Sequence, residues 1–218
     1  WRLDGAGFQA RMATVTGVLA IAATLAFVEL EPHKMASGVY RHGGLLSEKN
    51  VEILFHRDGK TATVNLVRSP GRVAIRTNGK SDAAMNFDPG GRVALDETTM
   101  VLTGALPLFL HPEAKTAANI GLGSGLTSHV LLASDTLREV DTIEIERAMI
   151  EGAKLFAPRN TRAYSDPRSQ IHIEDAKTFF AARRRKYDVI ISEPSNPWVS
   201  GVSTLFSEEF YGQMRRYL

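Results

Sequence analysis

Segments with strand character alternate with segments of helical spacing from about residue 96 onward. A strand, a helix and another strand in succession are typical of a parallel sheet covered by helices on both faces. We therefore predict an α/β fold with a Rossmann-like parallel sheet, to which this part of the chain contributes four strands. The expected strands are 117–122, 140–145, 170–173 and 187–191, and the expected helices are 98–110, 126–134, 147–156 and 176–184.

The preceding segment, residues 38–92, has a different sequence pattern, which predicts mainly β-strands. Its short runs contain β-branched residues and are separated by dipeptides that form tight turns. Two linked hairpins forming a small antiparallel sheet are expected. The runs are Val51–His56, Thr61–Arg68 and Arg72–Thr77, and the turns are Asp58-Gly59, Pro70-Gly71 and Asn78-Gly79.

The domain organisation follows from these patterns: residues 1–37 with an apolar helix, 38–92 as a β-hairpin domain and 93–218 as the α/β domain. The nearly uncharged run Met12–Val28 is either a buried helix, a signal-like anchor or a membrane span, since its length is at the lower limit for spanning. The chain begins without Met and ends in a helical pattern that no Gly or Pro stops. We therefore expect a segment of a longer protein, with the α/β domain incomplete at its C-terminus.

Composition excludes several classes of function. Lys and Arg total 26 against 24 Asp and Glu, a net charge of +2, which is too small to indicate a nucleic-acid partner. The chain has 0 Cys, so disulfides, a thiolate nucleophile and a cysteine zinc site are excluded. The 6 His are scattered, without a pair on one helix face, so no metal site is expected.

The first strand of the α/β region runs into a glycine-rich turn, Gly121 to Gly125, ahead of a helix. Glycines let the backbone approach a ligand closely, and a helix N-terminus favours polar or anionic groups. The spacing fits GxGxG and not the GxGxxG of dinucleotide-binding folds, because the third glycine falls at 125.

Acids follow the next two strands. Glu144, about 20 residues past the glycine turn, is placed to accept both hydroxyls of a ribose, whereas Glu146 better suits a helix N-terminus. Asp175 is placed to accept an adenine amino group and can also cap the following helix. The glycine turn and these acids, in this order, predict an adenosyl ligand such as S-adenosylmethionine.

The fourth strand is followed by Glu193-Pro194-Ser195-Asn196-Pro197-Trp198. Open α/β sheets bind ligands where the strand order reverses, between the first and fourth strands in this winding. Chemistry is therefore expected in this loop, opposite the glycine turn, although a rigid turn with a packed Trp is the alternative interpretation.

The order of these features resembles the spermidine synthases, which are polyamine aminopropyltransferases. The resemblance runs from about Asn78 to the C-terminus, and the stretch Ser200–Phe206 with the following Tyr211 is its most telling part. It is closest to a bacterial branch in which such a domain is fused behind membrane spans, and it favours a membrane anchor at 12–28. The implied fold is a class I methyltransferase-type sheet, truncated after the fourth strand and preceded by the antiparallel hairpin region.

The resemblance implies transfer of an aminopropyl group from decarboxylated S-adenosylmethionine to putrescine or a related amine, without a metal. It also implies a homo-oligomer on the cytoplasmic face, tethered to the inner membrane. Glu193 is the implied catalytic base. The implied donor-binding residues are Gly121, Gly123, Ser124, Gly125, Glu144, Ile145, Glu174 and Asp175, and the implied acceptor-binding residues are Asn196, Trp198 and Asp82.

The chain departs from the family pattern mainly at the acidic residues that bind the amine substrate. Two alternatives therefore stay open: an S-adenosylmethionine-dependent N-methyltransferase in which Asn196 orients the acceptor, and a non-catalytic nucleoside-binding domain. The departures are Leu122 and Ser124 in the glycine turn, Glu193 and Asn196 in place of Asp, Met100–Leu102 in place of a Tyr-Gln/His-Glu run, Asn78 in place of Asp and Asp82 in place of Gln.

Overall fold

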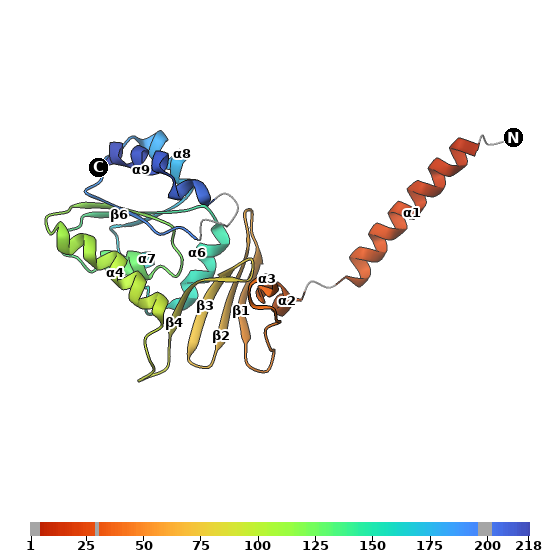
Figure 1. The fold of residues 1–218 in the computed structure, drawn as a ribbon, viewed down its shortest axis with the longest axis horizontal. Helices are drawn as coiled ribbons and strands as arrows, with labels where there is room; N and C mark the ends of the chain where they lie inside the picture. The colour runs from red at the N-terminus through yellow and green to blue at the C-terminus, as the bar shows by residue number, and fades with distance from the viewer. Residues whose placement is uncertain (1–4, 29–30, 196–201) are drawn as a thin grey trace. The chain divides into compact units, whose positions relative to one another are not determined.

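The computed structural model describes residues 5–28, 31–195 and 202–218, and the chain divides into two compact units between Glu31 and Pro32 (Figure 1). The first unit contains the helix α1 (Gly5–Phe27). Its part Gly7–Phe27 has 21 residues and a mean hydropathy of 1.6. At about 1.5 Å per residue, such a helix is long enough for the roughly 30 Å of a bilayer core. By length and composition α1 suits a membrane span, which by itself is weak evidence for one.

The second unit begins with two short helices, α2 (Pro32–Ala36) and α3 (Val39–His42), and a four-stranded antiparallel sheet. The expected hairpins are confirmed, but the sheet has a further strand, β4, that the sequence did not reveal. Lys, Ser, Asp and Ala are poor strand formers, so β4 depends on its pairing with β3 across the Asn78-Gly79 turn. The strands, in spatial order, are β1 (Glu52–Asp58), β2 (Thr63–Ser69), β3 (Arg72–Thr77) and β4 (Lys80–Asn86).

A parallel sheet with the strand order β7-β6-β5-β8 follows, as the alternating pattern predicts. The order reverses between β5 and β8, which pair directly and place the ends of both strands side by side. The strands are β5 (Thr116–Ile120), β6 (Glu139–Glu144), β7 (Ser169–Ile173) and β8 (Val189–Ser192). The helices are α4 (Leu95–Leu110), α5 (Leu126–Leu131), α6 (Arg147–Ala153), α7 (Arg162–Ser165), α8 (Ala176–Arg183) and α9 (Glu208–Met214), with single 3₁₀ turns at Lys154–Phe156, Ser203–Phe206 and Arg215–Tyr217.

Helices cover both faces of this sheet (Figure 1). Ala118 and Ile143 face α8 and α9, where Phe180 and Phe210 are fully buried. Ala117 on β5 points the other way, as neighbouring residues of a strand must, and packs with residues of α5. The central strand β5 is therefore buried on both sides, whereas the edge strand β7 is partly exposed.

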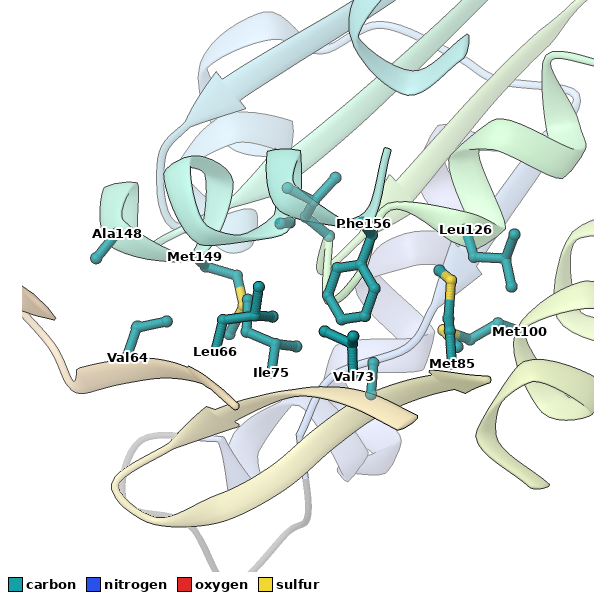
Figure 2. Close-up of a cluster of buried hydrophobic side chains, with 13 residues drawn as sticks. Val64, Leu66, Val73, Ile75, Met85, Met100, Leu126, Ala148, Met149 and Phe156 are labelled. Atoms are coloured by element: carbon teal, nitrogen blue, oxygen red, sulfur yellow. The ribbon is translucent and has the colours of Figure 1, made fainter. Parts of the chain in front are cut away.

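The two sheets are joined by one hydrophobic cluster (Figure 2). Leu66 and Ile75 of the antiparallel sheet are fully buried and point toward Met149 of α6 and the ring of Phe156. Each such side chain contributes about 1.5–3 kcal/mol through the apolar surface it removes from water. This packing holds the antiparallel sheet beside the parallel one, so side chains of both reach a common cleft.

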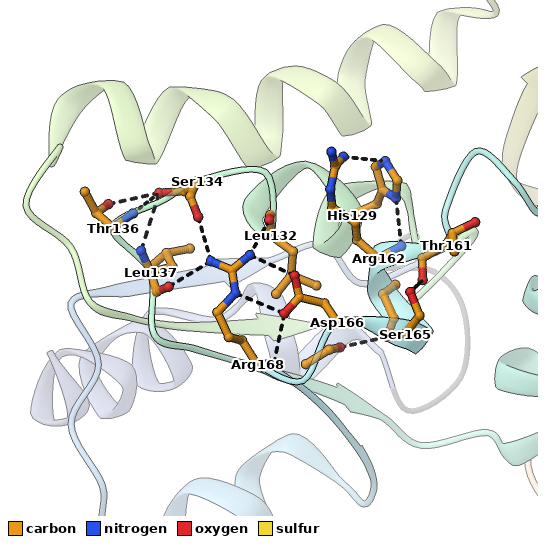
Figure 3. Close-up of polar contacts among 12 residues, drawn as sticks. His129, Leu132, Ser134, Thr136, Leu137, Thr161, Arg162, Ser165, Asp166 and Arg168 are labelled. Carbon is orange, nitrogen blue, oxygen red and sulfur yellow. Dashed lines mark hydrogen bonds and ion pairs between the residues drawn. The ribbon is translucent and has the colours of Figure 1, made fainter.

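Arg168, just before β7, stabilises the chain at the amino ends of the parallel strands (Figure 3). Its guanidinium donates hydrogen bonds to the carbonyls of Leu132, Ser134 and Leu137 at 2.6–2.9 Å. These carbonyls follow α5 and have no partner in the helix. Asp166 accepts from Nε and Nη2 of Arg168 at 2.9 and 2.8 Å, and this contact lowers the pKa of Asp166 to about 2.

Candidate active site

A cleft of about 720 Å³ lies where the carboxyl ends of the parallel strands face β4 of the antiparallel sheet. This volume is within the roughly 300–1,000 Å³ of small-molecule sites. Most of the site residues predicted from the sequence line this cleft. Ser124 and Gly125 do not line it. Asn196 and Trp198 lie outside the described residues. The predicted residues that line the cleft are Asp82, Gly121, Gly123, Glu144, Ile145, Glu174, Asp175 and Glu193.

The first half of the glycine turn faces the cleft. Gly121 has φ +94°, and a Cβ there would lie 2.7 Å from the carbonyl oxygen of Glu193. The N–H of Glu193 in turn donates to the carbonyl of Ile120 at 3.0 Å. Gly121 is therefore required because the chain after β8 passes directly over it, which fixes Glu193 beside the glycine turn.

The second half of the turn is structural. The hydroxyl of Ser124, which is fully buried, donates to Sδ of Met100 at 3.0 Å. Asn160 packs against Gly125 and donates to the carbonyl of Ser124 at 2.7 Å. Met100 itself lines the cleft with an apolar surface, at the place where the family pattern has Tyr.

Glu144, at the end of β6, is buried beside the glycine turn. Its carboxylate accepts the N–H of Leu122 at 3.0 Å and the N–H of Glu146 at 2.9 Å. Burial raises the pKa of Glu144 although these two hydrogen bonds oppose the shift. The neighbouring Ile145 is 52% exposed and lines the cleft, where its apolar side chain offers a surface for a flat ring.

Glu146 has the structural role that its position at a helix start indicates. Its carboxylate accepts from the N–H of Ala148, capping α6, and from the N–H and hydroxyl of Thr61 at 2.8 and 2.7 Å. Burial alone would raise the pKa of Glu146, but these hydrogen bonds outweigh it and lower the pKa. A Cβ on Gly59 would lie 2.2 Å from this carboxylate, so the β1–β2 turn needs glycine to pack here.

The two acids after β7 line the cleft, and each already forms a contact with another side chain. Glu174 accepts from Nη1 of Arg183 at 2.7 Å. Asp175 caps α8, because its Oδ1 accepts the N–H and the hydroxyl of Thr178 at 2.9 and 3.1 Å. Both bonds to Thr178 use the same oxygen, and none of the described residues donates to the second oxygen of Asp175.

Glu193, directly after β8, is the acid at the strand reversal. Its Oε2 accepts the hydroxyl of Thr127 at 2.6 Å, and burial raises the pKa of its carboxyl group. No ion pair to Glu193 is formed by the residues that the structure describes. A partly buried carboxylate with a raised pKa and one hydroxyl partner is suited to accept a proton from an amine.

Three cleft residues form a cluster that connects the two sheets, and the sequence pointed only to one of them. Nζ of Lys80 donates to Oδ1 of Asp82 and, at 2.9 Å, to the hydroxyl of Ser195. Ser195 donates to the same Asp82 oxygen at 2.8 Å. The i, i+2 spacing of Lys80 and Asp82 on one strand face was the available signal. Ser195 belongs to the loop in which the sequence predicts chemistry, but nothing in the sequence indicates its contact with Lys80.

The described residues contain no group of three or more His, Asp or Glu side chains placed to hold a metal ion. The strand reversal, the glycine turn and the acids after β6, β7 and β8 define an α/β protein of the Rossmann-like, methyltransferase type. The solved structure of a spermidine synthase in complex with the transition state analogue AdoDATO has this fold. It matches with a TM-score of 0.66 and 21% identity over 88% of this chain and 64% of that chain.

Sequence comparison identifies the family. Residues 99–218 match the model of the spermine/spermidine synthase domain, and the chain belongs to this family. The polyamine aminopropyltransferase of Alkaliphilus oremlandii is 32% identical over 107 residues, 49% of this chain and 37% of that protein. That of Thermotoga maritima is 30% identical over 140 residues, 60% of this chain and 47% of that protein. The chain therefore spans less than half the length of these relatives.

Proposed function

We propose that the protein transfers the aminopropyl group of decarboxylated S-adenosylmethionine to an amine such as putrescine. The observation that carries the proposal is Glu193, a partly buried carboxylate with a raised pKa held beside Gly121 at the strand reversal. Family membership and the names of the relatives support the same reaction.

The adenosyl half of the cleft suits the donor. Glu144 is in place to accept ribose hydroxyls, and Ile145 to cover one face of the base. The unused oxygen of Asp175 is in place to accept an adenine amino group. Gly123 leaves room for the sulfonium side of the donor, because it carries no side chain, and Gly121 lets the chain at Glu193 pass close beside it.

The chemistry assigned to Glu193 is proton transfer. The amine nitrogen attacks the carbon next to the sulfonium, the C–S bond breaks, and its electron pair neutralises the sulfur. The attacking amine must give up a proton before it can attack, because alkylammonium groups have pKa values of about 10 and only the neutral amine has a free lone pair. Glu193 accepts that proton, and the hydroxyl of Thr127 orients its carboxylate.

The decisive experiment incubates the full-length protein with putrescine and decarboxylated S-adenosylmethionine and identifies the products by mass spectrometry. Spermidine and methylthioadenosine, both lost in Glu193→Gln, are the expected result. Absence of any transfer product with this and other amines, while methylthioadenosine still binds, would overturn the enzyme assignment and favour a nucleoside-binding domain.

We further propose that α1 anchors the protein to the inner membrane with the cleft on the cytoplasmic side, and that the protein is a homo-oligomer. The length and apolar composition of Gly7–Phe27 support the anchor. Membrane fractionation of the full-length protein tests it: recovery in the membrane fraction, lost when residues 1–31 are deleted, is expected. Light scattering of the detergent-solubilised protein tests the oligomer, and a monomer mass would contradict it.

A further inference from the structure

Lys80 is the cleft feature that the proposed reaction leaves unexplained. Among the cleft-lining residues that the structure describes, it is the buried cation, with 6% of its surface exposed. Arg41 and Lys177 also line the cleft but are more exposed. A site built only for diamines, which carry two positive charges, gains nothing from a buried ammonium group in its wall.

Lys80 and Asp82 each have one polar group that forms no hydrogen bond with the described residues. A lysine ammonium has three N–H donors, and in the described part of the chain two of them are used, by Asp82 and Ser195. Oδ2 of Asp82 is buried and accepts no hydrogen bond from the described residues. Both residues line the cleft, and each has one polar group without a partner among the described residues.

A buried donor or acceptor without a partner is unfavourable, so this pair indicates a ligand that completes both. An ammonium group alone completes Asp82 and leaves Lys80 beside a like charge. A ligand with a carboxylate and an ammonium on one carbon completes both at once. We propose that the Lys80–Asp82 pair binds the α-amino-acid group of a substrate.

This inference rests on one part of the proposed function, namely that a group-transfer donor and an amine meet in this cleft, and it changes which substrate carries a carboxylate. The α-amino-acid group has two possible sources. It belongs either to the donor, as the methionine end of ordinary S-adenosylmethionine, or to the acceptor, as in ornithine or lysine. Each source has a counterpart that differs only by loss of the carboxylate: decarboxylated S-adenosylmethionine, putrescine and cadaverine.

The first arm measures binding to the full-length protein by calorimetry. If the donor carries the group, S-adenosylmethionine binds about tenfold or more tightly than its decarboxylated form, as expected for one charge-assisted hydrogen bond. Lys80→Met, which keeps the length of the side chain but not its charge, removes this preference. Methylthioadenosine lacks the amino-acid group, so its affinity stays the same in the variant.

The second arm measures kcat/KM with decarboxylated S-adenosylmethionine as donor. If the acceptor carries the group, ornithine or lysine is preferred over putrescine or cadaverine by about tenfold or more. Lys80→Met reverses or abolishes the ratio. Lys115→Met removes a lysine that does not line the cleft and serves as the charge-matched control.

Removing one partner of a buried ion pair can destabilise a protein, so the double variant Lys80→Met/Asp82→Asn is measured as well. It leaves no unpaired charge and is expected to lose the carboxylate preference while remaining folded. A preference for the decarboxylated compound in both arms, or ratios unchanged in both variants, would overturn the inference. Failure of the wild-type protein to bind methylthioadenosine would instead overturn the proposed function.

Discussion

At the carboxyl edge of the parallel sheet, Glu144 and Glu193 differ from Glu146, which caps α6, and from two carboxylates at the amino edge. At the carboxyl edge, burial raises the pKa values of Glu144 and Glu193, which have few partners. At the amino edge, hydrogen bonds lower the pKa values of Asp166 and Asp188. Asp188 accepts the N–H groups of Lys115 and Thr116 at 2.7 and 2.9 Å, and so connects the starts of β5 and β8.

This difference separates acids that stabilise the fold from acids that cost stability. A carboxylate with a lowered pKa binds its partners best when ionised, so it stabilises the native state at neutral pH. A carboxylate with a raised pKa is unfavourable in its ionised form, and a ligand gives it the partners it lacks. Substitutions at the two edges therefore test which acids belong to the site.

The largest effect is expected for Glu193→Gln. The amide cannot accept a proton, and loss of a general base typically lowers rates about 10²–10⁴-fold. We expect kcat for amine transfer to fall by at least about 100-fold, measured by product formation at saturating substrates. Methylthioadenosine affinity should stay within about threefold, because the substitution preserves shape. A loss of activity below about tenfold would show that another group accepts the proton.

A smaller effect, on affinity, is expected for Glu144→Gln. The amide presents one oxygen instead of two, so it cannot accept from a ribose and keep both backbone N–H bonds. We expect methylthioadenosine to bind about 10–100-fold more weakly, measured by calorimetry. The matched variant at the other edge, Asp188→Asn, should bind it normally. Equal losses in both variants would mean that the effect comes from the fold and not from a ligand contact.

Stability should change in opposite directions at the two edges. The pKa of Glu193 is raised above its ordinary value of 4.5, so ionising this group costs native-state stability as the pH rises above that value. Glu193→Gln should therefore have an equal or higher Tm at neutral pH. Asp188→Asn loses charge-assisted bonds at a solvent-exposed site and should be less stable by roughly 1 kcal/mol. A lower Tm for Glu193→Gln than for Asp188→Asn would contradict this assignment of roles.

The sequence predicts the carboxyl edge well because strand ends are read from local patterns. The strand alternation places Glu144, Asp175 and Glu193 at one edge, and the structure brings them to one cleft. The sequence does not show where a side chain turns: Ser124, expected at the donor, is buried against Met100.

Contacts between residues far apart in the chain could not be predicted either, because the sequence shows only local patterns. Strand β4 forms because β3 pairs with it, despite its own poor strand propensity. The Lys80–Ser195 bond joins residues 115 positions apart, and only the packing of the two sheets creates it. The roles of Asn196 and Trp198 stay predictions, since both lie outside the described residues.

The smallest effect is a pH dependence at the amino edge. The pKa of Asp166 falls from 3.8 to about 2 because Arg168 binds its carboxylate, so its stabilisation is complete above about pH 4. As the pH falls toward 2, the carboxylate takes up a proton and the stabilisation disappears. Asp166→Asn should have a lower Tm than the wild type at pH 7, and the difference should narrow between pH 4 and 2, followed by circular dichroism. Glu193→Gln is the control with the opposite sign, since its advantage over the wild type should also vanish in acid. A constant Tm difference for Asp166→Asn across this range would show that the amino edge depends on the shape of Asp166 and not on its charge.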